Sequence, residues 1–427
     1  MVRTESGGAS GARPAPDGTV TGVISLDDAR ALVWERCEPL PVEDADVRDM
    51  AGRPIAADVV STEDVPPFNN SAVDGFAVRS VDVASPPVAL DVVATVPAGS
   101  TSPVAVGPGQ AVRIMTGAPI PQGADAVVMV EDAEVLADGR VRLTATATPG
   151  GAIRDAGSDV RSGDVVFQAG TVVGAAAIGV LASINVRTVR ARRRAVVAVL
   201  ATGDELVVDG SPLAPGQIRE SNLSMLRQLL ADAGCVVDDL GVVRDDEAVL
   251  EAVLKSAASR CDAIVTSGGV SMGDFDVVKA VLSRVADMHW MQVAIKPAKP
   301  FAFGMLDSSD GRRVPVFGLP GNPVSSVVSF EMFARPALRR MMGHDRDALR
   351  PTVRAVLDAP LRRKVDGKTH LVRVHGAFAD DGRLHVRDTG PQGSHQLAST
   401  AIASGLAVVP DGTGLATGDE VNVLLLG

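Results

Sequence analysis

The sequence contains no tyrosine, and aromatic residues of all kinds occupy only 3% of its 427 positions. Proteins that bind single-stranded nucleic acid stack the bases on aromatic side chains, so this scarcity argues against that function. The net charge of -11 at pH 7 points the same way, because a negative field repels both nucleic acid and anionic membranes. We therefore expect neither nucleic acid nor a membrane as a partner.

Cysteine is also scarce. The three cysteines, Cys37, Cys235 and Cys261, are far apart and form no CxxC or Cys/His ligand pattern. A disulfide framework and a structural zinc site are therefore not expected, and a reducing compartment fits. No segment reaches the roughly 18 apolar residues that a membrane helix needs. Residues 1–21 lack the apolar stretch of a secretory signal, so we predict a disordered tail and a cytoplasmic protein.

The chain is long enough for about two to four domains. Ser25 and Asp28 resemble a helix capping box, which predicts a helix over 26–37. A short strand is expected near 55–60. Residues 187–194 read RTVRARRR, which is either an anion-binding patch or a solvated strand face with alternating arginines. We favour the second interpretation, because charge runs usually mark exposed surface.

Two stretches have the signals of β structure. Residues 62–160 alternate short valine-rich runs with glycine and proline, and Asp138-Gly139 marks a hairpin between two such runs. After about residue 350 the β signals return, with a hairpin at Asp381-Gly382 and a closing strand over 420–426.

Between these stretches, from about residue 195 to residue 343, strands alternate with helices. Predicted strands cover 195–203, 235–243, 262–269 and 314–321, and predicted helices cover 222–233, 246–258, 276–286 and a long stretch from Pro323. This alternation predicts a parallel, three-layer α/β domain. Ligands bind such sheets at the carboxyl ends of the strands.

Each of the four predicted strands ends in a polar cluster, and the four clusters cover 202–205, 244–246, 267–276 and 319–323. Gly268 and Gly269 remove side chains where a backbone must approach a ligand, and their N–H groups with Ser267 and Ser271 could cradle a phosphate. The Walker A pattern is absent. Asn322 and Pro323 are a natural N-cap and first helical residue, and a helix N-terminus attracts anions.

Acidic and basic side chains accompany these clusters. The acids, which would converge at one edge of the sheet, are Asp204, Glu205, Asp245, Asp274 and Asp276. Acids beside a phosphate need a bridging cation, and Mg²⁺ takes oxygen ligands from both. Lys296 and Lys299, held between prolines, could grip an oxyanion.

Each residue alone has a simpler explanation. Glycine-rich loops are often only tight turns, and Asp245 and Asp276 sit where helix caps belong. Four polar clusters at successive strand ends are harder to explain in that way, so together they favour a ligand site.

The motifs identify a family. PPFNNSAVDGFAVR (66–79), IMTGAPIP (114–121), ATGDEL (201–206), SGGVSMGDFD (267–276), IKPAKPFAFG (295–304), GLPGNPVSS (318–326) and GPQGSH (390–395) stand in the order in which they occur in this family. From about residue 22 onward the chain resembles the MoeA-type molybdopterin molybdenumtransferases, whose animal relative is the E domain of gephyrin.

The resemblance implies a multidomain fold of α/β and β parts, with an inserted mostly-β domain and a C-terminal β-barrel-like domain. The implied division is a tail (1–21), an N-terminal segment shared by the core and linker domains (22–61), the inserted domain (62–160), the return through the linker domain (161–186), the α/β molybdopterin-binding domain (187–343) and the C-terminal domain (344–427). It also implies an elongated homodimer, in which the β domain of one subunit completes the cleft of the other.

The implied reaction takes adenylylated molybdopterin and molybdate as substrates, depends on Mg²⁺, releases AMP and leaves molybdenum on the dithiolene sulfurs. The residues that match catalytic positions of the family are Asp74, Glu205, Asp245, Asp276 and Lys296, with Glu205, Asp245 and Asp276 as metal ligands. The residues expected to bind substrate are Thr116, Arg154, Asp159, Ser267, Gly268, Gly269, Ser271, Lys299, Pro320, Gly321, Asn322, Pro323, Arg373 and Ser394. Asp74 would reach across the dimer.

Four positions depart from the usual pattern of the family, namely Asn69, Ser158, Gln292 and Ala298; Ala298 stands in place of a glycine. Two alternatives remain open, which are molybdopterin adenylylation and a non-catalytic scaffold that binds molybdopterin. Further partners could be the adenylyltransferase or the recipient molybdoenzymes.

Overall fold

The computed structural model describes residues 19–270, 277–345 and 347–426. The chain forms two compact units. The core unit contains the residues up to Glu43, Gly52–Pro54 and the chain from Ala191 onward, and the β unit contains Asp44–Ala51 and Ile55–Arg190. Each unit is described by itself. No helix in the described part of the chain is long and apolar enough to cross a membrane.

A seven-stranded sheet forms the centre of the core unit, in the order β1-β19-β21-β22-β18-β14-β17. The bounds of its strands are β1 (Thr19–Ile24), β14 (Val196–Thr202), β17 (Val236–Val243), β18 (Ala263–Ser267), β19 (Ala286–Val293), β21 (Pro300–Asp307) and β22 (Arg313–Leu319). The four predicted strands, β14, β17, β18 and β22, are parallel as expected. The antiparallel strands β19 and β21, which were not predicted from the sequence, extend this sheet.

The predicted tail needs one correction. Residues 1–18 lie outside the described residues, but Thr19 to Thr21 belong to β1, which runs parallel to β19. The prediction of disorder was therefore wrong for these three residues. Thr19 pairs with Trp290 of β19, a long-range pairing that local composition alone could not reveal.

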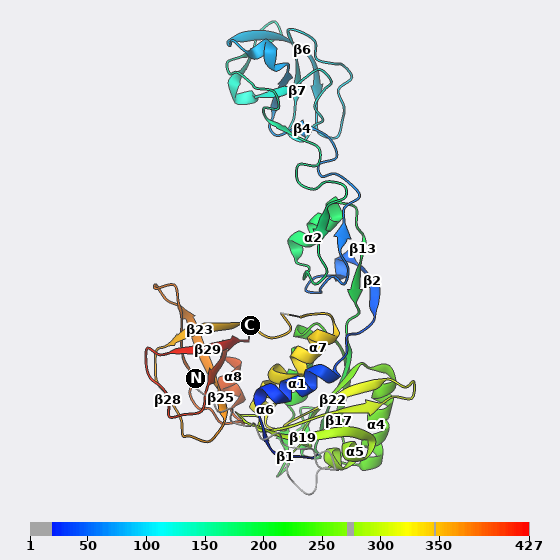
Figure 1. Cartoon of the computed structure of the whole chain (residues 1–427), viewed down its shortest axis with the longest axis vertical. Coiled ribbons are helices and arrows are strands. Elements are labelled where there is room, and N and C mark those ends of the chain that lie inside the picture. The colour runs from blue at the N-terminus through cyan, green and yellow to red at the C-terminus, as the bar shows by residue number, and fades with distance from the viewer. Residues whose placement is uncertain (1–18, 271–276, 346, 427) are drawn as a thin grey trace, which may run out of the picture. The chain divides into compact units, whose positions relative to one another are not determined.

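Helices cover both faces of this sheet, which confirms the three-layer prediction (Figure 1). One face packs against α1 (Leu26–Arg36), α3 (Asn222–Asp232), α6 (Pro323–Ser329), a π-helical turn (Phe330–Ala334) and α7 (Arg335–Met341). The other face packs against α4 (Glu247–Arg260) and α5 (Val277–Val285). Alternate residues of β14 enter the two cores, Val197 and Val199 on one side and Ala198 and Leu200 on the other. The Ser25 side chain caps α1 by accepting a hydrogen bond from the Asp28 N–H at 3.1 Å, as predicted.

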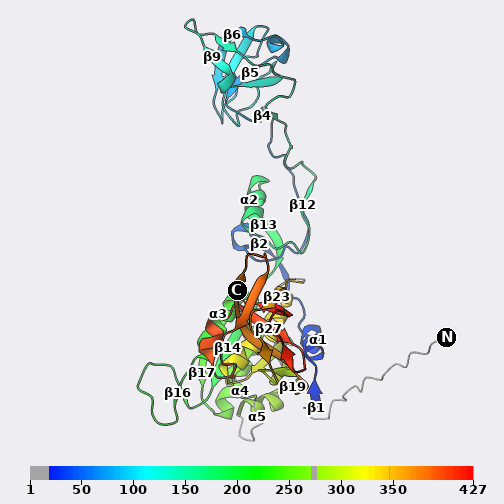
Figure 2. The ribbon, with the colours of Figure 1, turned by 90° about the vertical axis from the view of Figure 1, so that its left-hand side faces the viewer.

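The C-terminal part of the core unit is a closed β-barrel, as expected. Figure 2 shows its strands in orange and red. Its strands are β23 (Thr352–Leu357), β25 (Thr369–Phe378), β26 (Leu384–Asp388), β27 (Gly405–Val409) and β29 (Glu420–Leu425), and the pairing of β25 with β27 closes the barrel. The predicted hairpin at Asp381-Gly382 joins β25 to β26. Short elements beside the barrel are β20 (Ile295–Lys296), β24 (Leu361–Arg362), β28 (Gly414–Leu415) and α8 (Leu397–Ala401). Strand β20 pairs with β25, so that Lys296 lies opposite His370.

The β unit contains a six-stranded sheet in the order β8-β5-β7-β6-β10-β9. Its strands are β5 (Gly75–Val78), β6 (Val88–Val96), β7 (Gln110–Ile114), β8 (Ala126–Met129), β9 (Ala133–Val135) and β10 (Val141–Leu143), and the predicted hairpin at Asp138-Gly139 joins the last two. The remaining short elements of this unit are β3 (Val59–Val60), β4 (Asn70–Ser71), β11 (Ile153–Arg154), β12 (Val165–Phe167) and α2 (Ala175–Ser183). The paired strands β2 (Val42–Asp46) and β13 (Thr188–Arg192) each begin in one unit and end in the other. In β13 Val189 and Ala191 are buried while Arg190 is exposed, which fits the solvated strand face. For Arg193 this interpretation was wrong, because its guanidinium pairs with the buried Asp262 carboxylate.

Candidate functional site

The carboxyl ends of the parallel strands surround a cavity of about 770 Å³, called here the strand-end cavity. Predicted site residues from four separate loops line it, namely Glu205, Asp245, Ser267, Gly268, Gly269, Pro320, Gly321, Asn322 and Pro323. Strand β15 (Leu206–Val207), β16 (Ile218–Arg219) and the start of α3 complete the wall. The parallel topology therefore brings together residues that lie more than a hundred positions apart in sequence.

Glycine is required in two of these loops by backbone conformation. Gly268 and Gly269 have φ angles of +93° and +76°, which lie in the left-handed region that favours glycine. A Cβ atom on Gly268 would lie 3.2 Å from the Thr202 carbonyl oxygen. Gly203 has a φ of +144°, and a Cβ there would meet the Glu205 carboxylate at 2.6 Å. The loops therefore keep the backbone close to the cavity.

The predicted phosphate cradle is only partly available. The Gly268 N–H donates to the Leu319 carbonyl at 3.0 Å, and the buried Ser267 hydroxyl accepts a hydrogen bond from Asn222 at 2.9 Å. The Gly268 N–H is therefore already engaged, whereas the Ser267 hydroxyl only accepts in its bond with Asn222 and keeps its own hydrogen for donation. The phosphate cradle stays a prediction. Ser271 lies outside the described residues.

Asn222, at the start of α3, is a residue that the sequence motifs did not single out. Its Nδ2 donates to Ser267 Oγ at 2.9 Å and to the Gly321 carbonyl at 2.7 Å, so it ties the loop after β18 to the loop before α6. Its Oδ1 is buried and has no hydrogen-bond partner among the residues that the structure describes. The sequence did contain one sign that could have identified Asn222 as a site residue, because it is a polar residue at the start of a helix that follows a strand-end loop.

Glu205 and Asp245 supply carboxylates to the strand-end cavity. The cap of α4 is Asp246, whose side chain accepts from the Val249 N–H at 2.9 Å, so the interpretation of Asp245 as a helix cap was wrong. The Asp245 N–H lies 3.5 Å from Asp204 Oδ1. Asp274 and Asp276 lie outside the described residues.

The carboxylates fit a hard divalent cation. Within residues 19–270, 277–345 and 347–426, no three His, Cys, Asp or Glu side chains are arranged to hold a metal ion. Mg²⁺ needs fewer protein ligands than that, because one or two carboxylates and substrate phosphates commonly hold it. No cysteine or histidine of the described residues lines the strand-end cavity, so its donors are oxygens. Glu205 and Asp245 are therefore suitable for Mg²⁺ that also contacts a phosphorylated ligand.

The start of α6 borders the same cavity. Asn322 occupies the N-cap position with Pro323 as the first helical residue, as predicted, but the Asn322 side chain makes no capping hydrogen bond. The Val324 N–H donates to the Ser394 carbonyl at 3.1 Å. This bond joins the α/β layer to the loop over 390–395 of the C-terminal part.

Lys296 lines a second cavity, of about 430 Å³, which we call the cationic cavity. The other residues that line it are Pro297, Leu361, Arg362, Arg363, Lys364, Asp366, His370, Leu371, Val372, Asp388, Gln392 and Gly393. Lys299 is exposed, and the next residue, Pro300, lines the strand-end cavity. The segment 296–300 therefore connects the walls of the two cavities.

Ala298 lies between the two lysines with a φ of +74°. This conformation favours glycine, because a Cβ atom crowds the backbone there. The departure from the family's usual glycine is therefore a substitution into a strained position.

Arg373 is fully buried. Its guanidinium donates to Ser399 Oγ at 3.2 Å and to the Pro391 and Gly393 carbonyls at 2.8 and 3.4 Å. Burial lowers the pKa of Arg373 from its ordinary value. These contacts fix the loop that carries Ser394.

The predicted site residues of the β unit either belong to the segment 65–74 or make hydrogen bonds with it. Asp74 Oδ1 accepts from the Thr116 N–H at 2.7 Å and from the Thr116 hydroxyl at 2.8 Å, and these bonds lower the pKa of Asp74. Arg154 Nη2 donates to the Ala72 carbonyl at 3.4 Å. Asp159 is exposed, and its N–H donates to the Val65 carbonyl at 2.9 Å. The hydrogen bonds from Thr116 thus favour the ionised form of the Asp74 carboxylate.

Three of the departures from the family pattern also have a place in the structure. Asn69 Oδ1 accepts from the Ala156 N–H at 2.8 Å, so the amide makes a structural contact that a carboxylate could also make there. The Ser158 N–H donates to the Asp155 carbonyl at 3.1 Å in a turn. Gln292 lies on β19 opposite Pro300.

Comparison with known proteins gives consistent matches along the chain. Family models described as the MoeA N-terminal region (domain I and II), a probable molybdopterin binding domain and the MoeA C-terminal region (domain IV) match residues 24–185, 198–340 and 354–426. The molybdopterin molybdenumtransferase of Haemophilus influenzae is 37% identical over 91% of this chain and 94% of its own length. Molybdopterin molybdenumtransferase 2 of Mycobacterium tuberculosis is 39% identical over 92% and 96%. The crystal structure of the molybdopterin biosynthesis moeA protein of Pyrococcus horikoshii is similar with a TM-score of 0.78 at 26% identity, over 95% of this chain and all of that chain.

Proposed function

The chain belongs to the MoeA family, and from this premise we propose that it is a molybdopterin molybdenumtransferase of molybdenum cofactor biosynthesis. Its substrates would be molybdate and adenylylated molybdopterin, and AMP would be released. The observation that carries this proposal is the meeting of four strand-end loops and two carboxylates in one cavity, beside a second cavity that contains Lys296.

The strand-end cavity is suited to the phosphorylated part of the substrate. At Gly269 and at the start of α6 the backbone itself lines the cavity, where it could contact a ligand directly. Pro320, Gly321 and Asn322 complete this side of the cavity wall. Glu205 and Asp245, with Asp276, would hold Mg²⁺. When bound, Mg²⁺ supplies positive charge that neutralises carboxylate and phosphate oxygens. Asn222 and Ser267 keep the two loops at a fixed separation, so the phosphate contacts are organised in advance.

The lysines are suited to the oxyanion. Lys296 and Lys299 lie on a short segment between the two cavities, and Ser394 lies in the loop fixed by Arg373. We propose that these three side chains orient molybdate or the terminal phosphate of the pterin. The buried Arg373 would be a positioning residue in this arrangement.

The proposed function predicts AMP release from adenylylated molybdopterin that is stimulated by molybdate and lost when EDTA removes divalent metal. Restoring Mg²⁺ is expected to restore the activity, because carboxylates and phosphate repel each other without a cation. Chromatographic measurement of AMP over time tests this. AMP formation from ATP and molybdopterin without molybdate would instead indicate adenylylation, and binding of the pterin without turnover would indicate a scaffold.

We also propose a cytoplasmic homodimer in which Asp74 and Thr116 of one subunit complete the site of the other, with Arg154 and Asp159 beside them. Mixing equal amounts of the inactive Asp74→Ala and Asp245→Ala chains is then expected to restore activity, because each mixed dimer contains one intact site out of two. About half of the dimers are mixed after random exchange, so the expected activity is about a quarter of wild type per subunit. The test is AMP release after the two variants exchange subunits, with each variant alone as control. Mixtures that exchange but remain as inactive as the separate variants would rule out completion across the dimer.

A further inference from the structure

The cationic cavity concentrates positive charge in a protein whose net charge is -11. Its basic side chains are Lys296, Arg362, Arg363, Lys364 and His370, against the carboxylates Asp366 and Asp388. Global charge cannot explain such a cluster, and like charges in one cavity repel each other. These positive charges must therefore be neutralised either by acidic groups of the protein or by a bound anion.

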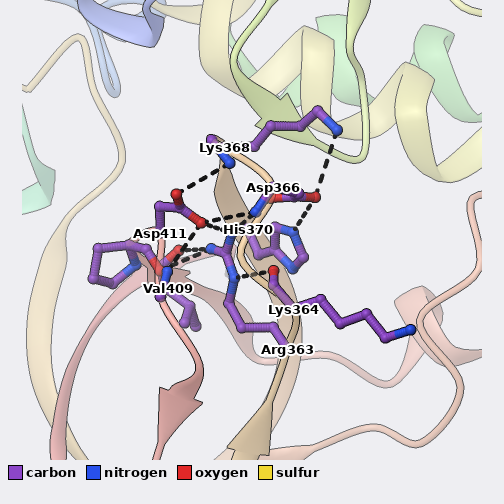
Figure 3. Close-up of polar contacts among 10 residues, drawn as sticks. Arg363, Lys364, Asp366, Lys368, His370, Val409 and Asp411 are labelled. Carbon is purple, nitrogen blue, oxygen red and sulfur yellow. Dashed lines mark hydrogen bonds and ion pairs between the residues drawn. The ribbon is translucent and has the colours of Figure 1, made fainter.

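Arg363 is compensated within the protein. Figure 3 shows its guanidinium enclosed by Asp366, Asp411 and the carbonyl of Val409. Both carboxylates lie 2.7 Å from Arg363 Nη2, and its side chain is only 3% exposed. Arg363 is therefore a structural residue of the cavity wall and contributes little free charge to the cavity.

The same network fixes the loop over 363–368. Asp411 accepts hydrogen bonds from the N–H groups of Asp366 and Gly367, at 3.1 and 3.0 Å. Asp366 also contacts His370 Nε2 at 3.1 Å and Lys368 Nζ at 3.5 Å (Figure 3). Because two cations and a histidine already surround Asp366, its carboxylate is not available to neutralise other cavity residues.

The remaining cations have no such compensation. Lys296, Arg362 and Lys364 line the cavity, and in the part of the chain that the structure covers none of them has a hydrogen-bond or ion-pair partner for its side chain. In Figure 3 the Lys364 side chain extends away from the carboxylates of the network. Asp388, the other acid of the cavity, accepts from the Gly390 N–H at 3.0 Å. A neutral N–H does not cancel the charge of Asp388, so the cavity holds three positive side chains against one negative side chain, in a wall that is held rigid by its own ion pairs.

We propose that Arg362 and Lys364 join Lys296 in binding a tetrahedral oxyanion in the cationic cavity. The inference rests on the proposed function, in which Lys296 orients molybdate or a terminal phosphate, and it extends that site to two residues of the C-terminal part. Charge-assisted hydrogen bonds from an arginine and lysines are the usual means of holding such an anion. The anion is either free molybdate or the phosphate end of the pterin substrate, since both offer the same oxygens.

Calorimetric titration of the full-length protein with sodium molybdate, and separately with inorganic phosphate, tests the site without any need for turnover. Arg362→Gln and Lys364→Gln are each expected to raise the Kd by about 10-fold or more, because each removes one charge-assisted contact. Arg387→Gln is the matched control, since Arg387 is an exposed arginine of the same barrel and lies outside the cavity. Thermal unfolding of each variant checks that the barrel is intact.

Steady-state kinetics then separates the two sources of the anion. A raised KM for molybdate with unchanged kcat supports free molybdate as the occupant, whereas a raised KM for adenylylated molybdopterin supports its phosphate end. Wild-type protein that binds neither probe, or folded variants with Kd and KM values within twofold of wild type, would overturn the inference. In that case continued AMP release by the variants would leave the proposed function standing, and absence of AMP release in wild type would reject the proposed function separately.

Discussion

Replacing Asp245 by asparagine is expected to reduce molybdate-stimulated AMP release by at least about 100-fold. Asp245 is one of two carboxylates from the described residues that we assign to Mg²⁺, and it lines the strand-end cavity with Glu205. Asparagine has nearly the same shape but carries no charge, so it would weaken both the attraction for the cation and the compensation of phosphate. The measurement is the initial rate of AMP release at saturating Mg²⁺ and molybdate.

The neighbouring acid provides the matched control. Asp246 accepts a hydrogen bond from the Val249 N–H at 2.9 Å and caps α4. Asp246→Ala is expected to cost about 1 kcal/mol of stability through loss of the cap, with AMP release within a few-fold of wild type. Equal losses of activity in the two variants, or full activity in Asp245→Asn, would contradict the assignment. The pair therefore separates chemistry from helix capping at adjacent positions.

The largest expected effect on stability is at Glu331, in the π-helical turn between α6 and α7. Its side chain is only 1% exposed, and it accepts two hydrogen bonds from Arg350, both at 3.0 Å, with Arg335 at 3.9 Å. Burial, and after it the positive charge of Arg350, lower the pKa of Arg335 to about 10. Glu331→Ala would leave two guanidinium groups without their shared carboxylate, at an expected cost of about 3–5 kcal/mol.

Urea unfolding followed by tryptophan fluorescence measures this cost. The chain has two tryptophans, Trp34 on α1 and Trp290 on β19, and both lie in the core unit that contains Glu331. Asp307→Ala is the control, because Asp307 pairs with Arg313 at 3.4 Å while its side chain is 82% exposed. Its loss is expected to cost less than about 1 kcal/mol. A comparable small loss for Glu331→Ala would show that the buried pair contributes little.

The predicted strands and helices agree with the structure where the hydrophobic pattern of one segment is enough to identify the element. Strands β14, β18 and β22 have a hydrophobic core on each side of the sheet, so their sequences are continuous apolar runs. The edge strand β17 is less buried and contains two aspartates, and its valines at both ends were enough to predict it. Strands β19 and β21 were missed. They pair antiparallel with each other, and β21 pairs antiparallel with β22, so they depart from the alternation of strand and helix on which the prediction rested. The two hairpins were predicted because Asp-Gly favours the required turn locally.

The candidate site divides in a similar way. The rule that ligands bind at strand ends is enough to group Glu205, Asp245, Gly268 and Pro320 around one cavity, because their positions follow from the strand pattern. It does not distinguish which of two adjacent acids caps α4, because that depends on the path of the backbone. Nor does it reveal Asn222. The hydrogen bonds of Asn222 reach Ser267 and Gly321, which lie 45 and 99 positions further along the chain.

The sequence by itself determined the family, the alternation of strands and helices, and the chemical types of residue at the strand ends, because these depend on local motifs and periodicity. Only the tertiary structure decided which polar groups are already engaged. Arg373, on β25, is buried and donates to the loop that it supports, while Arg362 and Lys364 line the cavity beside Lys296. The physical reason is that hydrogen bonding and charge compensation depend on neighbours in space, and those neighbours come from distant parts of the chain.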